Sequence, residues 1–349
     1  MKIPRAWHGG LSMAAAARVS ILCLCGIASS SLGSTNAVSI CPYPEGKPSA
    51  VAFTFDDGIV EHDLVGAVEL EKRGWRGTFN IIASAPGKRP TILSWEQIAD
   101  LARRGHEIAN HSMTHPNIAG LLKTAKYEKA AEETAGARDV IAAHAGVVPR
   151  TFCYPGNVRT DESDRFVEQS HLIAQPGDRI GVGAWTGPAD ADYAARVVAE
   201  PGRFSVFVFH GLMPDSAGWA PFKDASTFTR LLDGIKAKEA DVHVGTFVEV
   251  AAYIRRRDHA KLMPLADACS WNAKDATVCQ LELDPAYGAF AGSLFLRCEA
   301  DGVSEVRVNG KVVVTTERDG CLVFVAQTGD VVALRHVPKG NSNGIEEAE

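Results

Sequence analysis

The segment Val-Ala-Phe-Thr-Phe-Asp-Asp-Gly, residues 51–58, places an apolar, strand-forming run directly before two carboxylates and a glycine. A run of this kind, closed by a turn signal, predicts a core strand. The strand would deliver Asp56 and Asp57 to the rim of a site, where one carboxylate could bind a metal while its neighbour acts as a base. Asp-Asp-Gly is also an ordinary turn after a strand. The rest of the chain must therefore supply partners for the two aspartates.

Composition limits the function classes. The chain has 349 residues, of which 46% are hydrophobic and 22% charged. These values fit a globular protein with one large and one small domain. The formal net charge is -6 and no arginine-rich segment stands out, which argues against a nucleic-acid partner.

The N-terminus has the pattern of a secretory signal peptide. Lys2 and Arg5 precede an apolar run over residues 13–27, and small residues follow up to Ala37. We expect cleavage near Ala37, and hence a secreted, periplasmic or cell-envelope protein. A retained anchor is the alternative, but the apolar part after Arg18 is short for a bilayer. We therefore expect no transmembrane span in the mature chain.

Cysteine usage suggests disulfides. Six cysteines remain after residue 37: Cys41, Cys153, Cys269, Cys279, Cys298 and Cys321. Export would permit bridges, and the last four could form two, with three pairings that the sequence does not rank. A structural zinc site is a weaker alternative, because these cysteines form no Cys-x-x-Cys pair.

Residues 51–257 alternate short apolar runs with amphipathic stretches, which predicts strand and helix units of an α/β parallel sheet or barrel. Strands are expected at 77–82, 106–110, 150–155, 181–185, 203–210 and 242–244. Helices are expected at 62–73, 94–105, 121–144, 160–169, 224–238 and 246–257. We interpret the arginines at 255–257 as a solvated helix end that closes the domain.

After residues 262–264 the chain changes to short valine-rich strands, with an Asn309-Gly310 hairpin turn. This pattern predicts a small all-β sandwich. The expected organisation is a signal peptide at 1–37, an α/β domain at 38–258, the β domain at 265–338 and a flexible tail at 339–349.

Two histidines could complete a metal site with Asp57. His111 and His115 are four residues apart and follow a predicted strand, so a turn of helix would place both imidazoles on one face. Two histidines, one carboxylate and open positions for water form a common catalytic metal site, although His-x-x-x-His alone is often coincidental. Such a metal would polarise a carbonyl and activate water.

Three further positions could handle protons and charge. Asp56 could take a proton from water, and His210, at the end of an apolar strand, could protonate a leaving amine. The alternative for His210 is a histidine bonded to a backbone carbonyl. The Tyr-Pro-Gly turn at 154–156 could aim a backbone N–H at an oxyanion, or be a simple turn.

Four motifs in order resemble the polysaccharide deacetylase family, also called the NodB-homology domain or carbohydrate esterase family 4. They are Thr-Phe-Asp-Asp-Gly at 54–58, His-Ser-x-x-His at 111–115, Phe-x-Tyr-Pro at 152–155 and the apolar strand ending at His210. The resemblance covers roughly residues 49–257. It implies a distorted (β/α) barrel and metal-dependent removal of acetyl groups from sugars.

The resemblance also implies roles for individual residues. Asp56 matches the general base, His210 the general acid, and Tyr154 the backbone contact to the oxyanion. The metal triad corresponds to Asp57, His111 and His115, with zinc as the usual metal and cobalt or nickel as substitutes. Substrate contacts are expected from Trp219, Pro155 and Trp185.

The sequence departs from the family in two motifs. Cys153 stands where many members have an arginine that orients the catalytic aspartate, and Arg150 could replace it only if the strand bends. A further motif, which the family counts as its fourth, usually consists of an aspartate and a tryptophan that support the catalytic histidine. It is not clear in this sequence. Trp185 with Asp178 or Asp190 is the best match.

We therefore expect a secreted hydrolase that removes N-acetyl groups from a chitin-like or other GlcNAc-containing polymer. An O-acetyl esterase acting on acetylated xylan is an alternative with the same residues. A degenerate carbohydrate-binding protein is a third, motivated by the absent arginine, but the retained aspartates and histidines argue against it. The sequence leaves the oligomeric state and the role of the β domain open.

Overall fold

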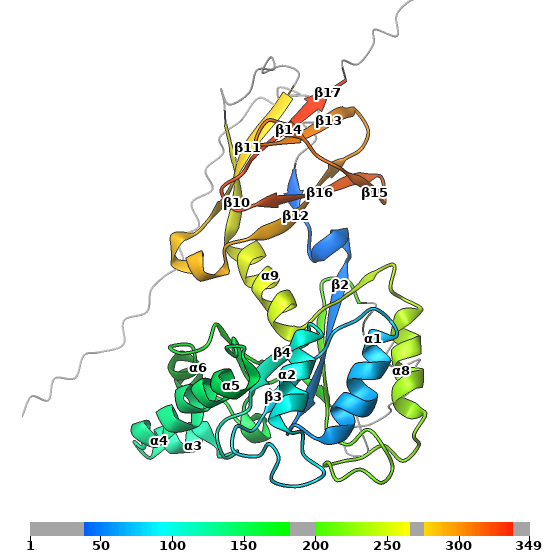
Figure 1. The fold of residues 1–349 in the computed structure, drawn as a ribbon. Coiled ribbons are helices and arrows are strands. Elements are labelled where there is room, and N and C mark those ends of the chain that lie inside the picture. The colour runs from blue at the N-terminus through cyan, green and yellow to red at the C-terminus, as the bar shows by residue number, and fades with distance from the viewer. Residues whose placement is uncertain (1–37, 182–197, 199, 266–275, 338–349) are drawn as a thin grey trace, which may run out of the picture. The chain divides into compact units, whose positions relative to one another are not determined.

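The computed structural model describes residues 38–181, 198, 200–265 and 276–337. An eight-stranded sheet with parallel pairing forms the α/β part of this region (Figure 1). Its strand order is β6-β5-β4-β3-β2-β8-β7, with β9 also paired to β2. The strands are β2 (Ser49–Asp56), β3 (Thr78–Ile81), β4 (Glu107–Asn110), β5 (Thr151–Phe152), β6 (Ile173–Ala174), β7 (Ile180–Gly181), β8 (Phe204–Phe209) and β9 (Val242–Val244). The predicted α/β fold of distorted-barrel type is confirmed.

Strand β2 is the centre of this sheet, and all of its residues are buried. Phe55 stacks on Phe79 of β3 and on Phe209 of β8, with ring centroids 4.9 and 5.4 Å apart. Helices cover these rings through apolar side chains such as Leu70, Leu101, Ile141 and Leu231. The strand is buried by helices and by neighbouring strands, which explains its nearly continuous apolar sequence.

The helices follow the predicted capping signals in several places. Ser94 and Gln97 form the expected capping box of α2 (Trp95–Arg103). The predicted helix at 62–73 is a π-helical turn, η2 (His62–Ala67), continued by α1 (Val68–Glu71). Further helices of the described region include α6 (Asp161–Val167), α8 (Thr227–Lys236) and α9 (Phe247–His259), with short 3₁₀ turns η1 (Pro44–Gly46) and η4 (Pro155–Asn157).

The prediction of one long helix over 121–144 is wrong. The chain forms α3 (Ile118–Lys123), breaks, and resumes as α4 (Tyr127–Ala131), η3 (Glu132–Gly136) and α5 (Ala137–Ala145). Asn117 starts α3 early by accepting a hydrogen bond from the Gly120 N–H at 2.9 Å. Ala125 has a φ of 54°, a left-handed conformation that ends the helix.

Two antiparallel sheets form the β part. One has the order β1 (Ser39–Ile40), β12 (Ser293–Glu299), β16 (Cys321–Gln327) and β15 (Thr316–Arg318). The other has the order β10 (Ala260–Pro264), β11 (Ala276–Leu283), β17 (Val331–His336), β13 (Val303–Val308) and β14 (Lys311–Val312), and η5 (Pro285–Phe290) lies between β11 and β12 in sequence. Leu296 and Phe324 of the first sheet share a core with Leu281 and Val332 of the second, which confirms the predicted sandwich.

The hairpin between β13 and β14 has the predicted turn. Asn309 and Gly310 have φ values of 50° and 76°. Two consecutive positive φ values are the requirement of a type I′ turn, which only residues such as Asn and Gly meet at low cost.

The expected disulfides are absent among the described cysteines. All five of them are free thiols: Cys41, Cys153, Cys279, Cys298 and Cys321. Cys298 pairs across the sheet with Leu322, while Cys321 pairs with Glu299, so the two thiols point to opposite faces. Cys269 lies outside the described residues.

The arginine run at 255–257 is not simply a solvated helix end. Arg256 donates to the carbonyls of Phe290 and Ser293 at 2.5 and 2.6 Å, and Arg257 donates to that of Pro42 at 2.6 Å. These guanidinium groups therefore satisfy backbone acceptors beyond their own helix.

The predicted signal peptide and the predicted tail fall outside the described residues. Within the described ranges, no helix has both the length and the apolar character needed to cross a bilayer.

Glu107 ties three strands of the sheet to α9. Its carboxylate accepts hydrogen bonds from the hydroxyls of Thr151 and Thr78, at 2.5 and 2.8 Å, and from the Val248 N–H at 2.8 Å. Burial raises the pKa of Glu107 above its ordinary value despite these three donors.

This raised pKa predicts a pH effect on stability. A carboxyl whose pKa is raised on folding contributes stability at low pH that is lost as the pH rises through the folded value. Glu107→Gln removes this ionisation, and an amide can still accept from Thr78 and Val248. We expect the free energy of unfolding of the variant to improve relative to the parent between pH 4 and pH 7, measured by urea denaturation. A constant difference between variant and parent over this range would contradict the prediction.

Candidate active site

The predicted site residues follow different strands but meet at one edge of the sheet. Parallel strands β2, β4, β5 and β8 end at this edge, where binding sites of such sheets form. A cavity of about 400 Å³ opens there. Its lining includes Asp56, Asp57, His111, His115, Tyr154, His210 and Trp219.

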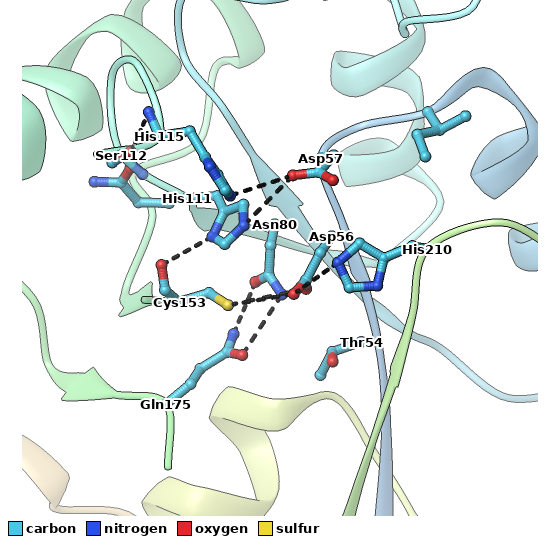
Figure 2. Close-up of polar contacts among 12 residues, drawn as sticks. Thr54, Asp56, Asp57, Asn80, His111, Ser112, His115, Cys153, Gln175 and His210 are labelled. Carbon is cyan, nitrogen blue, oxygen red and sulfur yellow. Dashed lines mark hydrogen bonds and ion pairs between the residues drawn. The ribbon is translucent and has the colours of Figure 1, made fainter. Parts of the chain in front are cut away.

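Asp57, His111 and His115 converge on one point (Figure 2). Asp57 Oδ1 lies 3.6 Å from Nε2 of His111 and 3.6 Å from Nε2 of His115. Zinc–ligand bonds of about 2.0–2.1 Å place tetrahedral ligand atoms roughly 3.3 Å apart. The observed separations are therefore close to those that a shared divalent ion requires.

The histidines converge through a loop, and the predicted helical turn over 111–115 is wrong. Ser112 and His115 have positive φ values of 69° and 67°. The Ser112 N–H donates to the Asn110 side chain, and the His115 N–H donates to the Ser112 hydroxyl, both at 2.8 Å. Glu133 holds Thr114 through its N–H and its hydroxyl, each at 2.7 Å. Side-chain hydrogen bonds thus replace the helical ladder in setting the imidazole positions.

The second nitrogen of His111 supports a metal-binding role. His111 Nδ1 lies 2.9 Å from the Cys153 carbonyl, so it carries the proton and leaves the Nε2 lone pair facing Asp57. Burial lowers the pKa of His111, which favours this neutral form. Two imidazoles and one carboxylate are a ligand set that fits zinc or cobalt.

A second cluster, Asp56, His111 and Cys153, also brings three metal-binding atoms together. It is the weaker candidate. Burial raises the pKa of the Cys153 thiol well above its ordinary value, so the sulfur stays protonated. Asp56 is also held by other partners.

Asp56 is a buried carboxylate whose Oδ1 has two strong donors, whereas the Cys153 thiol is a weak donor 3.8 Å from Oδ2. Its Oδ1 accepts from Nη2 of Arg179 at 2.8 Å and from the side-chain amide of Asn80 at 2.6 Å. Its Oδ2 lies 4.0 Å from Nε2 of His210. Burial alone would raise the pKa of Asp56, but the charges of Arg179, His111 and His210 together lower it well below its ordinary value.

Arg179 is the residue that sequence reasoning missed. Its side chain is 4% exposed, and it also donates to the Thr54 hydroxyl at 2.7 Å and to Cys153 Sγ at 2.9 Å. Arg179 thus supplies, beside Cys153, the guanidinium that is missing from the Phe-x-Tyr-Pro motif at 152–155. The alternative that Arg150 takes this part is wrong, because Arg150 is exposed at the opposite end of β5.

The topology explains how Arg179 reaches Asp56. β6 and β7 are consecutive in sequence but lie at opposite ends of the strand order. The segment between them therefore has to cross from one end of the sheet to the other. It brings Arg179 to Asp56. It also brings Gln175 to Asn80, with a 2.8 Å hydrogen bond between their side chains (Figure 2). An arginine directly before a short apolar strand was the only sequence signal.

His210 and Trp219 form one wall of the cavity. The His210 and Trp219 rings meet edge to face, with centroids 5.3 Å apart. Trp219 is 56% exposed, so much of its indole faces outward. This arrangement suits packing against the apolar face of a ring-shaped ligand.

The remaining residues that the sequence analysis predicted for the site do not all lie at the cavity. The Tyr154 hydroxyl donates to Asp164 at 2.9 Å, so its side chain is engaged with α6. Pro155 is buried, whereas the next residues, Gly156 and Asn157, line the cavity. Asp178 is exposed. The predictions for Trp185 and Asp190 lie outside the described residues.

The sequence comparison agrees with the motifs. Residues 44–172 match the model of the family described as polysaccharide deacetylase. The matched region contains the first three of the motifs on which the resemblance rests. No match was found among curated proteins.

Solved structures of deacetylases and esterases resemble the chain weakly. The Bc1960 peptidoglycan N-acetylglucosamine deacetylase is 23% identical, with 60% of this chain and 90% of that chain covered and a TM-score of 0.44. The peptidoglycan deacetylase PdaC from Bacillus subtilis is 20% identical, with coverages of 60% and 94% and a TM-score of 0.43. A family 4 acetyl xylan esterase from Clostridium thermocellum, in complex with a cobalt ion, is 19% identical, with coverages of 57% and 89% and a TM-score of 0.42. Likenesses of this size determine neither the substrate nor the metal.

The Arg179 contacts predict a large stability effect. Removing one partner of a buried ion pair leaves an uncompensated charge, which costs about 3–5 kcal/mol. We expect Arg179→Gln to lower the free energy of unfolding by about this amount in urea denaturation. Arg150→Gln, at an exposed position, should change it by less than about 0.5 kcal/mol. Equal small effects of the two variants would show that the Asp56–Arg179 pair is not essential to the fold.

Proposed function

We propose that the protein is a divalent-metal-dependent hydrolase that removes N-acetyl groups from a GlcNAc-containing polysaccharide or oligosaccharide. The observation that carries this proposal is the convergence of Asp57, His111 and His115 beside Asp56 and His210 in one cavity. The family match over residues 44–172 supports the same reaction class.

The metal would be held by Asp57, His111 and His115, with zinc proposed and cobalt or nickel as substitutes. When bound, an ion with this donor set polarises a carbonyl and lowers the pKa of water. The protein's contribution is to hold the three ligand atoms within 4.8 Å of one another. The Cys153 carbonyl fixes the orientation of His111 at 2.9 Å.

Asp56 would receive the proton of the attacking water. Its Oδ1 already accepts from Arg179 and Asn80, whereas Oδ2 has the weak Cys153 thiol donor at 3.8 Å and lies 4.0 Å from His210 Nε2. The water oxygen forms a bond to the acetyl carbon, and the resulting negative charge on the acetyl oxygen would be stabilised by the Tyr154 backbone N–H.

His210 would act as the proton donor to the leaving group. It would give a proton to the sugar nitrogen as the carbon–nitrogen bond breaks, so the products are acetate and a free amine. Trp219, packed edge to face on His210, would cover one face of the sugar ring.

The same residues support an O-acetyl esterase, because an alkoxide leaving group also benefits from a proton donor. Acetate release from chitooligosaccharides and from acetylated xylan, measured at equal enzyme concentration, separates the two substrates. We expect a kcat/KM at least about tenfold higher for the chitooligosaccharides. The reverse order would replace the N-acetyl proposal with the esterase.

A secreted or cell-envelope location is part of the proposal and rests on the N-terminal pattern at residues 1–37. An acetylated polymer outside the cytoplasm would be accessible to such a protein.

Metal removal tests the proposed function. We expect chelator treatment to abolish acetate release from chitooligosaccharides, and zinc or cobalt to restore it. His111→Ala should lower kcat/KM by about a hundredfold or more, since even the loss of a residue that orients a ligand costs 10–100-fold. The control His144→Ala removes an exposed histidine that stacks on Trp95, and should leave activity unchanged. Activity that survives chelation, or persists in His111→Ala, would exclude this mechanism.

Asp56→Asn tests the proton-accepting role separately. The amide keeps the shape of the side chain but accepts no proton, so we expect kcat to fall by about 10²–10⁴-fold. Zinc content, measured by elemental analysis, should stay at the parent level. Full acetate release by this variant would exclude Asp56 as the base.

A further inference from the structure

The loop that carries His210 and Trp219 is held by the loop that follows Asp57. Strand pairing between β2 and β8 ends at Phe55 and Phe209, one residue before His210. Beyond these residues, backbone hydrogen bonds between β2 and β8 no longer fix the positions of the two following loops relative to each other. Side chains of Glu61 and His62 take over this connection.

His62 contacts the backbone of His210. His62 is fully buried, and its Nε2 lies 2.6 Å from the His210 carbonyl oxygen. The Ile59 N–H donates to Nδ1 at 3.3 Å, so the proton of the neutral ring sits on Nε2 and is donated to His210. Burial lowers the pKa of His62 to about 4, in agreement with the neutral form.

Glu61 holds the next part of the same loop. Its Oε1 accepts from the Leu212 N–H at 2.7 Å and from the Ser216 hydroxyl. Ser216 in turn accepts from the Gly218 N–H at 2.9 Å, and the Gly211 N–H donates to the Trp219 carbonyl at 3.0 Å. The chain between His210 and Trp219 is thus closed on itself and fixed to Glu61.

The two loops are also in tight van der Waals contact. A Cβ built on Gly218 would lie 2.4 Å from Ile59 Cδ1 and 2.8 Å from the Gly211 nitrogen. A Cβ on Gly211 would lie 2.7 Å from Pro221 Cα. The loop therefore has little room to move while these contacts persist.

We propose that Glu61 and His62 form a clamp, defined as these two side chains, that positions the proton donor His210 and the sugar-facing Trp219 relative to Asp56. Both are positioning residues, and their catalytic part rests on the proposed function. His62 acts on the His210 backbone and should affect the proton-transfer step. Glu61 acts on the segment leading to Trp219 and should affect substrate binding.

Two substitutions of His62 separate its two hydrogen bonds. In His62→Gln the amide nitrogen can reach the position of Nε2 and still donate to the His210 carbonyl. In His62→Asn the shorter side chain can accept from Ile59 but cannot reach His210. We expect kcat for chitooligosaccharide deacetylation to fall about tenfold in His62→Asn and to stay within about threefold of the parent in His62→Gln, with KM unchanged in both.

A substrate with a better leaving group distinguishes a role of His62 in positioning His210 from a general loss of structure in the variant. p-Nitrophenolate departs without protonation, so hydrolysis of p-nitrophenyl acetate does not need His210 as an acid. His62→Asn should leave this reaction within about twofold of the parent. Equal losses on both substrates would show that His62 is only structural.

Variants of Glu61 test the other half of the clamp, and a variant of His106 serves as a control for the loss of a buried histidine. Glu61→Ala should raise KM for the oligosaccharide about fivefold or more with little change in kcat, whereas Glu61→Gln keeps the accepting oxygen and should resemble the parent. His106 is a buried histidine that directly precedes β4, at the end of the strand away from His111. It accepts from the Gly77 N–H at 3.0 Å and contacts Glu71 at 2.9 Å. His106→Asn should reduce stability without the selective loss on the amide substrate.

Hydrogen exchange tests the clamp independently of activity. Deuterium uptake of peptides covering residues 210–219 should rise in Glu61→Ala and His62→Asn, and stay at the parent level in Glu61→Gln and His106→Asn. Unchanged uptake in the first pair would overturn the clamp even if the parent is active. If the parent releases no acetate, the proposed function fails and the exchange result alone decides whether the clamp exists.

Discussion

The buried ion pair between Asp56 and Arg179 is the interaction on which the site depends. Both side chains are 6% exposed or less, and neither charge would be stable at this depth without the other. Arg179 also binds Thr54 and Cys153, so one guanidinium joins the central strand β2 to the residue that follows β5. The pair occupies Oδ1 of Asp56 and thereby determines which carboxylate oxygen faces the cavity. A structural requirement of the core and a chemical requirement of the site are met by the same contact.

Much of the fold was predictable because it depends on local patterns. The apolar run ending in Asp56, the Ser94 capping box and the Asn309-Gly310 turn each carry their own structural signal. Among the wrong predictions, the helical turn at 111–115 and the disulfides failed because the deciding contacts are not local in the pattern. The loop at 111–115 is shaped by Asn110 and by Glu133 from a later helix, and a helical spacing of two histidines says nothing of either. Likewise, spacing alone cannot show that Cys298 and Cys321 lie on opposite faces of a sheet.

The residues of the candidate site also divide into those that the sequence predicted and one, Arg179, that it did not. Asp57, His111, His115 and His210 follow predicted strands, and the rule that parallel strands end at one edge was enough to bring them together. Arg179 could not be found by that reasoning, because its position follows from the crossing between β6 and β7, which only the strand order reveals. The family motif predicts an arginine at the position of Cys153, whereas the guanidinium comes from Arg179, 26 residues further along the chain. The guanidinium thus occupies the expected place in space from a different place in the chain.

The structure holds the two halves of the proposed chemistry by different means. Asp56 and Asp57 lie at the end of a fully buried strand, with Asp56 tied to Arg179 and Asn80 from two other segments. His210 lies just past the last paired residue of β8, where side chains rather than the strand ladder hold the backbone. A carboxylate that receives a proton and ligands that hold an ion need fixed positions throughout the reaction. A proton donor must also accommodate the arrival and departure of a sugar beside Trp219, and a loop held by a few replaceable hydrogen bonds can be adjusted to different sugars without disturbing the metal ligands.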